Sequence, residues 1–132
     1  MLRIHEQEAI LEPSSMNKLH SEEMELVTKL HTAAKNNESK LVLELLNKLI
    51  DHTAKHFSDE EKLMEEAAYM DYELHKFEHA KQLLDLQSIR SFYEMTNDTQ
   101  SVYTYLEDSL TPWVIKHVQE MDVNAADFLK NQ

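Results

Sequence analysis

Apolar residues recur along this chain at intervals of three and four, which is the spacing of an amphipathic helix. Such a run covers about residues 14–35 after Pro13, with its apolar stripe at Leu19, Met24, Leu26, Val27, Leu30, Ala33 and Ala34. A second run covers about residues 40–66, and a third covers about residues 71–95. The second run places its inward apolar side chains at Leu41, Leu45, Leu46, Leu49, Ile50, Phe57 and Met64. Each run is long enough to bury one face of a helix against its neighbours.

A fourth run, about residues 98–129, contains Pro112, whose ring nitrogen cannot donate to the carbonyl of Asp108. Two interpretations are open. The helix is bent at Pro112, or Thr111 caps a new helix that has Pro112 at its first position. We favour the bent helix, because the apolar pattern continues through this point at Val102, Tyr105, Leu106, Leu110 and Trp113.

Short links join these four helices. The first link contains Asn36 and Asn37, and asparagine tolerates the left-handed conformation that glycine would otherwise supply in this glycine-free chain. Helices of similar length with short links lie antiparallel to their neighbours. We therefore predict an all-α protein, an up-down-up-down antiparallel four-helix bundle. Residues 1–132 would form one domain, with residues 1–13 as an N-terminal arm.

Composition and charge narrow the function. The formal net charge of −12 and the lack of a basic stripe argue against nucleic acid as a partner. The N-terminus lacks a continuous apolar signal segment, and no run approaches the roughly 20 apolar residues of a membrane span. We expect a soluble, cytoplasmic protein that does not bind membranes. Because the chain has no cysteine, a metal ion would be held by His, Asp, Glu or water.

Histidines and acidic residues gather at helical spacing within residues 52–79. His56 and Glu60 are four residues apart, as are His75 and His79, so each pair lies on one face of its helix, one turn apart. One such pair arises easily by chance in a helix rich in acids. Two pairs that face each other across a turn are stronger evidence for a metal site inside the bundle.

The first and last helices add further candidates. His20 lies on or beside its apolar stripe. His117 and Asp122 are five residues apart, about 140° around an ideal helix, so they would straddle a site or require a local widening of the helix. Taken singly, each of the eight histidines is more simply a surface residue. We expect His52 to be a supporting or packing residue, and we expect solvated side chains at Asp59, Glu61, Glu65 and Glu66.

Two rival metal motifs are missing. Ferritin-like di-iron bundles use Glu-x-x-His, and none of the residues three positions before a histidine here is Glu. The zincin motif His-Glu-x-x-His would need a glutamate at the position of Lys76.

Over nearly its full length the chain resembles the hemerythrin family, whose pattern is a His, then HFxxEExxM, then HxxxH, then WLxxHIxxxD. The matching segments are HFSDEEKLM (56–64), ELHKFEH (73–79) and PWVIKHVQEMD (112–122). The resemblance implies two iron ions joined by an oxo or hydroxo bridge. The implied ligands are His20 and His56 on one ion, His75, His79 and His117 on the other, and Glu60 and Asp122 between them.

The first helix departs from the family pattern Asp-x-Gln-His-x-x-Leu, because Asn17, Leu19 and Glu23 stand in place of Asp, Gln and Leu around His20. The later segment LHTAA (30–34) lies at the expected distance and supports this register. A third departure is Val114, where the family commonly has a leucine that lines the oxygen pocket.

The ligand count suggests an activity. Two octahedral ions offer about twelve positions, of which five histidines, two bridging carboxylates and a bridging hydroxide fill about eleven. One vacancy suits one small diatomic molecule. We expect reversible O2 binding for storage, delivery or sensing, in a dry pocket that by resemblance is walled by Phe57, Trp113 and Val114. The alternatives are a di-iron enzyme of the same fold that acts on peroxide or nitric oxide or protects iron centres, and a metal-free helical adaptor.

Overall fold

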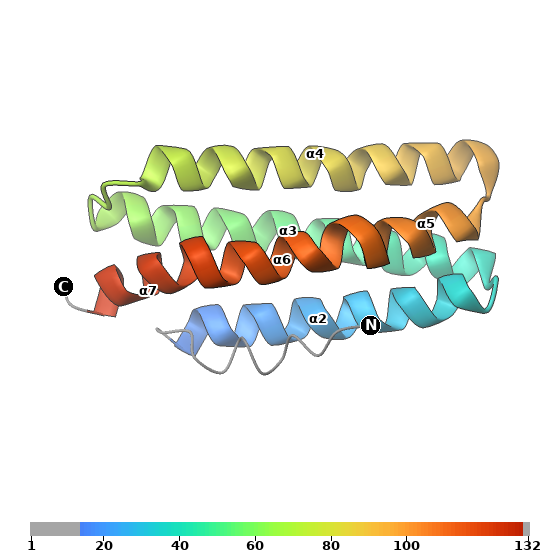
Figure 1. Cartoon of the computed structure of the whole chain (residues 1–132), viewed down its shortest axis with the longest axis horizontal. Coiled ribbons are helices and arrows are strands. Elements are labelled where there is room, and N and C mark those ends of the chain that lie inside the picture. Colours follow the sequence, from blue (N-terminus) through green and yellow to red (C-terminus); the bar gives the residue numbers. More distant parts are fainter. Residues whose placement is uncertain (1–13, 131–132) are drawn as a thin grey trace.

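The computed structural model describes the backbone of residues 14–130, and the side chains of residues 21–130 except that of Ala126. Four long helical segments run antiparallel to their neighbours (Figure 1). This arrangement confirms the predicted all-α bundle, and the predicted arm, residues 1–13, lies outside the described residues. The first three helices are α2 (Ser14–Lys35), α3 (Ser39–Glu66) and α4 (Tyr72–Thr96).

The last long segment, called here the C-terminal helix, alternates between α-helical and π-helical turns. Its parts are α5 (Thr99–Tyr105), η1 (Leu106–Leu110), α6 (Thr111–His117), η2 (Val118–Asp122) and α7 (Val123–Lys130). Leu110 and Thr111 both have right-handed helical backbone angles, so Thr111 does not cap a new helix. The helix therefore continues through Pro112, as the favoured interpretation requires, and the irregularity before Pro112 is the π-helical turn η1. The bend at Pro112 stays a prediction.

The links close the bundle with left-handed residues. Asn37 has φ 56° and Asn97 has φ 53°, and both follow the end of a helix where asparagine is well tolerated. Ala68 has φ 55° after α3, a position at which the sequence offers neither glycine nor asparagine. There the backbone N–H of Tyr69 donates to the carbonyl of Met64 at 2.9 Å, which satisfies an otherwise orphaned helix-end carbonyl.

The apolar core is concentrated at the end of the bundle that holds the α2–α3 and α4–α5 links. Its most buried members include Leu30, Val42, Leu46, Leu49, Leu86, Tyr93, Val102 and Leu106. The predicted inward position of Leu41 is wrong, because this side chain is 39% exposed and its neighbour Val42 points into the core. None of the described helices is long and apolar enough to cross a membrane.

Candidate metal centre

Five buried side chains from three helical segments converge at the other end of the bundle. Each offers one ligand atom, and these five atoms all lie within 4.8 Å of one another. Glu60 comes from α3, His75 and His79 come from successive turns of α4, and His117 and Asp122 come from the C-terminal helix. All five were predicted as site residues from their spacing and from the family pattern.

The π-helical turn η2 brings His117 and Asp122 together. In an α-helix these residues would point about 140° apart. In the structure the backbone N–H of Val123 donates to the carbonyl of Val118, five residues earlier, so the turn is wider than an α-helical one. Nε2 of His117 then lies 2.9 Å from Oδ1 of Asp122. Of the two arrangements left open by the sequence, the structure adopts the widened helix.

The nitrogen atoms in this cluster point at one another. Nε2 of His117 lies 3.0 Å from Nε2 of His75 and 3.2 Å from Nε2 of His79. Oδ1 of Asp122 lies 2.7 Å from Nε2 of His75, and Oε1 of Glu60 lies 3.3 Å from Nε2 of His79. Ring nitrogens this close need shared protons or a cation between them. A buried set of three imidazoles and two carboxylates fits a divalent transition-metal ion and by itself leaves the element open.

His79 is oriented for this role by Glu61. Nδ1 of His79 lies 2.8 Å from Oε2 of Glu61, so the N–H on Nδ1 donates outward and leaves the lone pair of Nε2 facing the cluster. The prediction that Glu61 is a solvated residue is wrong, because its side chain is only 21% exposed. By contrast, Asp59 pairs with Lys55 at the surface, as expected of a solvated acid.

His56 lies beside this cluster and contacts a carboxylate on each ring nitrogen. Its Nε2 contacts Glu60 and its Nδ1 contacts Glu23, while the hydroxyl of Thr53 donates to the other carboxylate oxygen of Glu23 at 3.1 Å. Sequence reasoning gave Glu23 no function. The available signal was a charged residue on the apolar stripe of the first helix, at a position where the family pattern has leucine.

These contacts raise the pKa of two histidines. Burial alone would lower the pKa of His56, but the charges of Glu60 and Glu23 and hydrogen bonds to both hold it well above its ordinary value. Burial likewise opposes protonation of His79, and hydrogen bonds to Glu60 and Glu61 raise its pKa overall. A metal ion that binds here must therefore displace protons from the cluster.

Two aromatic rings lie against the candidate ligands. Phe57 stacks on His79 with ring centroids 3.8 Å apart, and Trp113 stacks on His117 with centroids 4.4 Å apart. Val114, one residue further along α6, is buried. Of the three residues predicted to line a pocket, Phe57 and Trp113 thus lie against the histidine cluster, while Val114 belongs to the apolar core, and the pocket itself stays a prediction. A cavity of about 270 Å³ opens beside Trp113 and His117, with the charged side chains of Glu78, Lys81, Lys116 and Glu120 on its walls.

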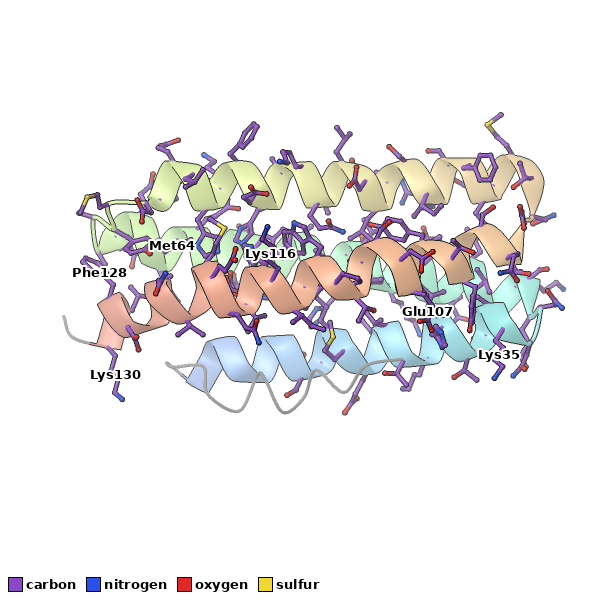
Figure 2. The ribbon with its side chains drawn as sticks, viewed as in Figure 1. Lys35, Met64, Glu107, Lys116, Phe128 and Lys130 are labelled. Atoms are coloured by element: carbon purple, nitrogen blue, oxygen red, sulfur yellow. The ribbon has the colours of Figure 1, made fainter. Side chains whose placement is uncertain are left out.

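The histidines outside the cluster lie in different parts of the bundle. His20 belongs to α2, but its side chain lies outside the described part of the chain, so its role as a ligand stays a prediction. His52 lies on the outer side of His56, with ring centroids 6.3 Å apart, and its Nε2 is 3.3 Å from Oε2 of Glu22. His31 lies toward the apolar end of the bundle, where it stacks on Tyr103 and contacts Glu107, which faces α2 in Figure 2.

Comparisons with known proteins bear on the family and the fold of this chain. No family model matches the chain. Among curated relatives, the bacteriohemerythrin of Methylococcus capsulatus is 33% identical over 111 residues, which cover 78% of this chain and 77% of that protein. The bacteriohemerythrin of Aquifex aeolicus is 25% identical over 114 residues, covering 86% and 87% respectively. A crystal structure of wild-type hemerythrin shares the fold, with a TM-score of 0.74 at 23% identity and 88% of each chain covered.

Proposed function

Because the chain belongs to the hemerythrin family, we propose that it binds O2 reversibly at a centre of two non-haem iron ions inside the bundle. The observation that carries this proposal is the convergence of five buried ligand atoms within 4.8 Å, three of them imidazole nitrogens. Ferrous iron would supply the electrons that reversible O2 binding needs. The rest of the activity depends on how the chain's own residues hold and shield the ions.

The ligands divide between two positions. His75, His79 and His117 would hold one ion, His56 and His20 would hold the other, and Glu60 and Asp122 would bridge them. The position of Glu60 supports this division, because one of its carboxylate oxygens faces His79 and the other contacts His56. Its two oxygens are thus directed at the two groups of histidines.

Residues around the ligands fix their orientation. Glu61 accepts the Nδ1–H of His79, and Glu23, itself held by Thr53, contacts Nδ1 of His56. Carboxylates in this position select the tautomer whose Nε2 faces the metal and increase the basicity of the ring. Phe57 and Trp113 cover ring faces of His79 and His117 and would keep water from the centre, which reversibility requires.

Anaerobic loading with ferrous iron tests the function. We expect two iron ions per chain, an absorption band on exposure to O2, and return to the colourless state when O2 is removed. His117→Gln should lose iron and the band, and His31→Gln, whose ring lies outside the cluster, should keep both. Iron that turns over peroxide or nitric oxide without a reversible O2 spectrum would indicate the enzyme alternative, and a chain that binds no iron would be the metal-free adaptor.

Val114 bears on how long the O2-bound state lasts. Valine is one methylene shorter than the family's usual leucine and would leave room for water near the centre. Val114→Leu should therefore slow the autoxidation measured by stopped-flow absorption, and Ile115→Leu on the neighbouring position is the matched control. An unchanged rate in Val114→Leu would refute this role of Val114.

A further inference from the structure

Helix α4 is apolar on two opposite faces. Its inner face carries the buried residues His75, His79, Gln82, Leu86 and Tyr93. Its outer face carries large apolar side chains that are exposed, at Leu74 (57%), Phe77 (59%), Leu84 (62%), Phe92 (46%) and Met95 (84%). At 100° per residue these five lie within an arc of about 80°, roughly opposite the buried set. We call them the outer stripe.

The outer stripe has no partner within the described bundle. Helix α4 packs against α3 and α5, and it runs along one edge of the bundle in Figure 1. Single exposed apolar residues are common on protein surfaces. A stripe of two phenylalanines, two leucines and a methionine along one helix, interrupted by Lys81 and Ser88, is typical of an interaction surface.

The order of residues in the outer stripe is symmetric. Leu74 lies as far before the midpoint between Leu84 and Asp85 as Met95 lies after it, and the same holds for Phe77 and Phe92. A surface with this symmetry complements itself when a second copy is turned through two-fold rotation, as in the interfaces of cyclic dimers. We propose that the outer stripe is the interface of a homodimer in which two copies pack α4 against α4 in antiparallel orientation.

The antiparallel register pairs like with like along the stripe. Leu74 would face Met95 of the second copy, Phe77 would face Phe92, and the two copies of Leu84 would meet at the two-fold axis. The polar residues Lys81 and Ser88, which also lie within the arc, would face each other. The aromatic pairs at Phe77 and Phe92 would supply most of the buried area.

Charge complementarity selects this orientation. Lys81 of one copy would lie close to Asp85 of the other, displaced along the helix axis by the rise of three residues, about 4.5 Å. The two-fold symmetry would form this pair twice. A parallel, in-register pair would instead place Lys81 against Lys81 and Asp85 against Asp85. In the single copy the Lys81 ammonium lies at the surface, 5.3 Å from the ring centroid of Phe77 and 3.6 Å from Oε2 of Glu78.

Sedimentation of the iron-free and iron-loaded wild-type protein over a range of concentrations tests the proposal. We expect a monomer–dimer equilibrium that strengthens with added salt, because salt screens the repulsion between chains of formal charge −12. Leu84→Glu places two like charges at the two-fold axis and should weaken the dimer by roughly 100-fold. Leu63→Glu, which alters an exposed leucine on α3 outside the stripe, should leave it unchanged.

A charge exchange tests the orientation. In the antiparallel pair, Lys81→Asp and Asp85→Lys should each weaken the dimer, because each puts like charges together, and the double variant should restore it. In a parallel, in-register pair each single change would only exchange one like-charge contact for another and leave the dimer strength nearly unchanged. All sites are exposed, so circular dichroism should show the same helix content in every variant. The thermal midpoints should agree at concentrations low enough for every variant to be monomeric. A wild-type protein that stays monomeric up to its solubility limit, or a Leu63→Glu variant that dissociates like Leu84→Glu, would overturn the proposal and leave the stripe to a different protein.

Discussion

The two ends of the bundle differ in how many polar side chains they bury. The end that holds the α2–α3 and α4–α5 links, called here the apolar half, is packed with hydrocarbon from residues such as Val42, Leu46, Tyr93 and Leu106. The other end, the polar half, buries imidazoles and carboxylates at Glu23, His56, Glu60, His75, His79, His117 and Asp122. Helix α3 crosses both halves and changes character near Thr53.

The two halves contribute differently: the apolar half stabilises the fold, and the polar half forms the candidate metal centre. Each large aliphatic side chain buried in the apolar half contributes about 1.5–3 kcal/mol to folding. The polar half must first overcome the cost of removing charges from water, and it recovers that cost only if its groups are paired or hold a metal ion. We infer that the apolar half drives folding and thereby holds the polar half in a geometry that it would not maintain alone.

Links at the apolar end reinforce this division. The hydroxyl of Tyr93 donates to the carbonyl of Ser39 at 2.9 Å, and the hydroxyl of Thr99 donates to the side chain of Asn37 at 2.6 Å. These bonds tie the start of α3 to α4, and the α2–α3 link to α5, far from the candidate ligands. The apolar half is therefore closed at its end as well as packed in its interior.

Truncating a leucine in the apolar half tests this division with the largest expected effect. Leu46 is fully buried, so Leu46→Ala should lower the free energy of unfolding by about 2–5 kcal/mol, measured by urea denaturation. The number of iron ions per folded chain should not change, because Leu46 lies ten residues before His56 on α3. Leu41→Ala, at a 39% exposed position of the same helix, is the control and should cost far less. Loss of iron in the folded Leu46→Ala protein would show that the halves are not separable.

Removing iron should destabilise the polar half and leave the local stability of the apolar half unchanged. A ligand present at a thousand times its Kd stabilises the folded state by about 4 kcal/mol, and chelation removes that contribution. Hydrogen exchange should then accelerate in residues 56–60, 75–79 and 117–122, where imidazoles and carboxylates face one another without a cation. Amides in residues 42–49 and 86–93 should keep their protection at temperatures below the unfolding transition. Uniform acceleration along all helices would contradict the proposed independence.

A variant with a smaller expected effect tests whether Glu61 positions the candidate ligand His79. Glu61→Gln keeps the size of the side chain but removes the charge that faces Nδ1 of His79, and it should weaken iron binding by about 10–100-fold. In the iron-free protein the pKa of His79 should fall, because the hydrogen bond to Glu61 helps to raise it. Glu65→Gln, an exposed acid on the next turn of α3, is the matched control. If both variants bind iron equally well, Glu61 does not position His79.

The fold was accessible from the sequence because apolar periodicity reports directly which face of a helix is buried. The pattern placed four helices and predicted that the last one continues through Pro112. It failed at Leu41, since two adjacent apolar residues at the start of α3 satisfy the periodicity about equally well and only packing selects Val42. The left-handed Ala68 was also beyond reach, because alanine has no intrinsic preference for that conformation.

The site could be predicted only in part, because the sequence reports the spacing within one regular helix but not the packing between helices. His56 with Glu60 and His75 with His79 follow from α-helical geometry, whereas His117 with Asp122 depends on the π-helical turn η2. Glu61 was taken as solvated because adjacent helix residues point about 100° apart, and the sequence alone does not show that His79 of α4 lies on that side. Glu23 becomes meaningful only when α2 is packed against Thr53 and His56.

The smallest effect is expected at the cap of α5, on the surface of the apolar half. The carboxylate of Asp98 accepts hydrogen bonds from the backbone N–H groups of Gln100 and Ser101 at 3.1 Å and 3.3 Å. The hydroxyl and backbone of Ser101 lower the pKa of Asp98 below its usual 3.8. Asp98→Ala should slightly lower the thermal midpoint at neutral pH without changing iron content, and Asp98→Ser should restore most of it.

The pH dependence of the thermal midpoint tests whether the cap acts through the charge of Asp98. A group whose pKa is lower in the folded state stabilises the fold above its unfolded pKa, and this contribution disappears as the pH falls through the folded value. The difference in thermal midpoint between wild type and Asp98→Ala should therefore be constant at neutral pH and shrink below about pH 4. A difference that persists in strong acid would mean that Asp98 acts through the shape of the link and not through its charge. In either case the iron centre should be unaffected, because the cap closes the half of the bundle that contains none of the candidate ligands.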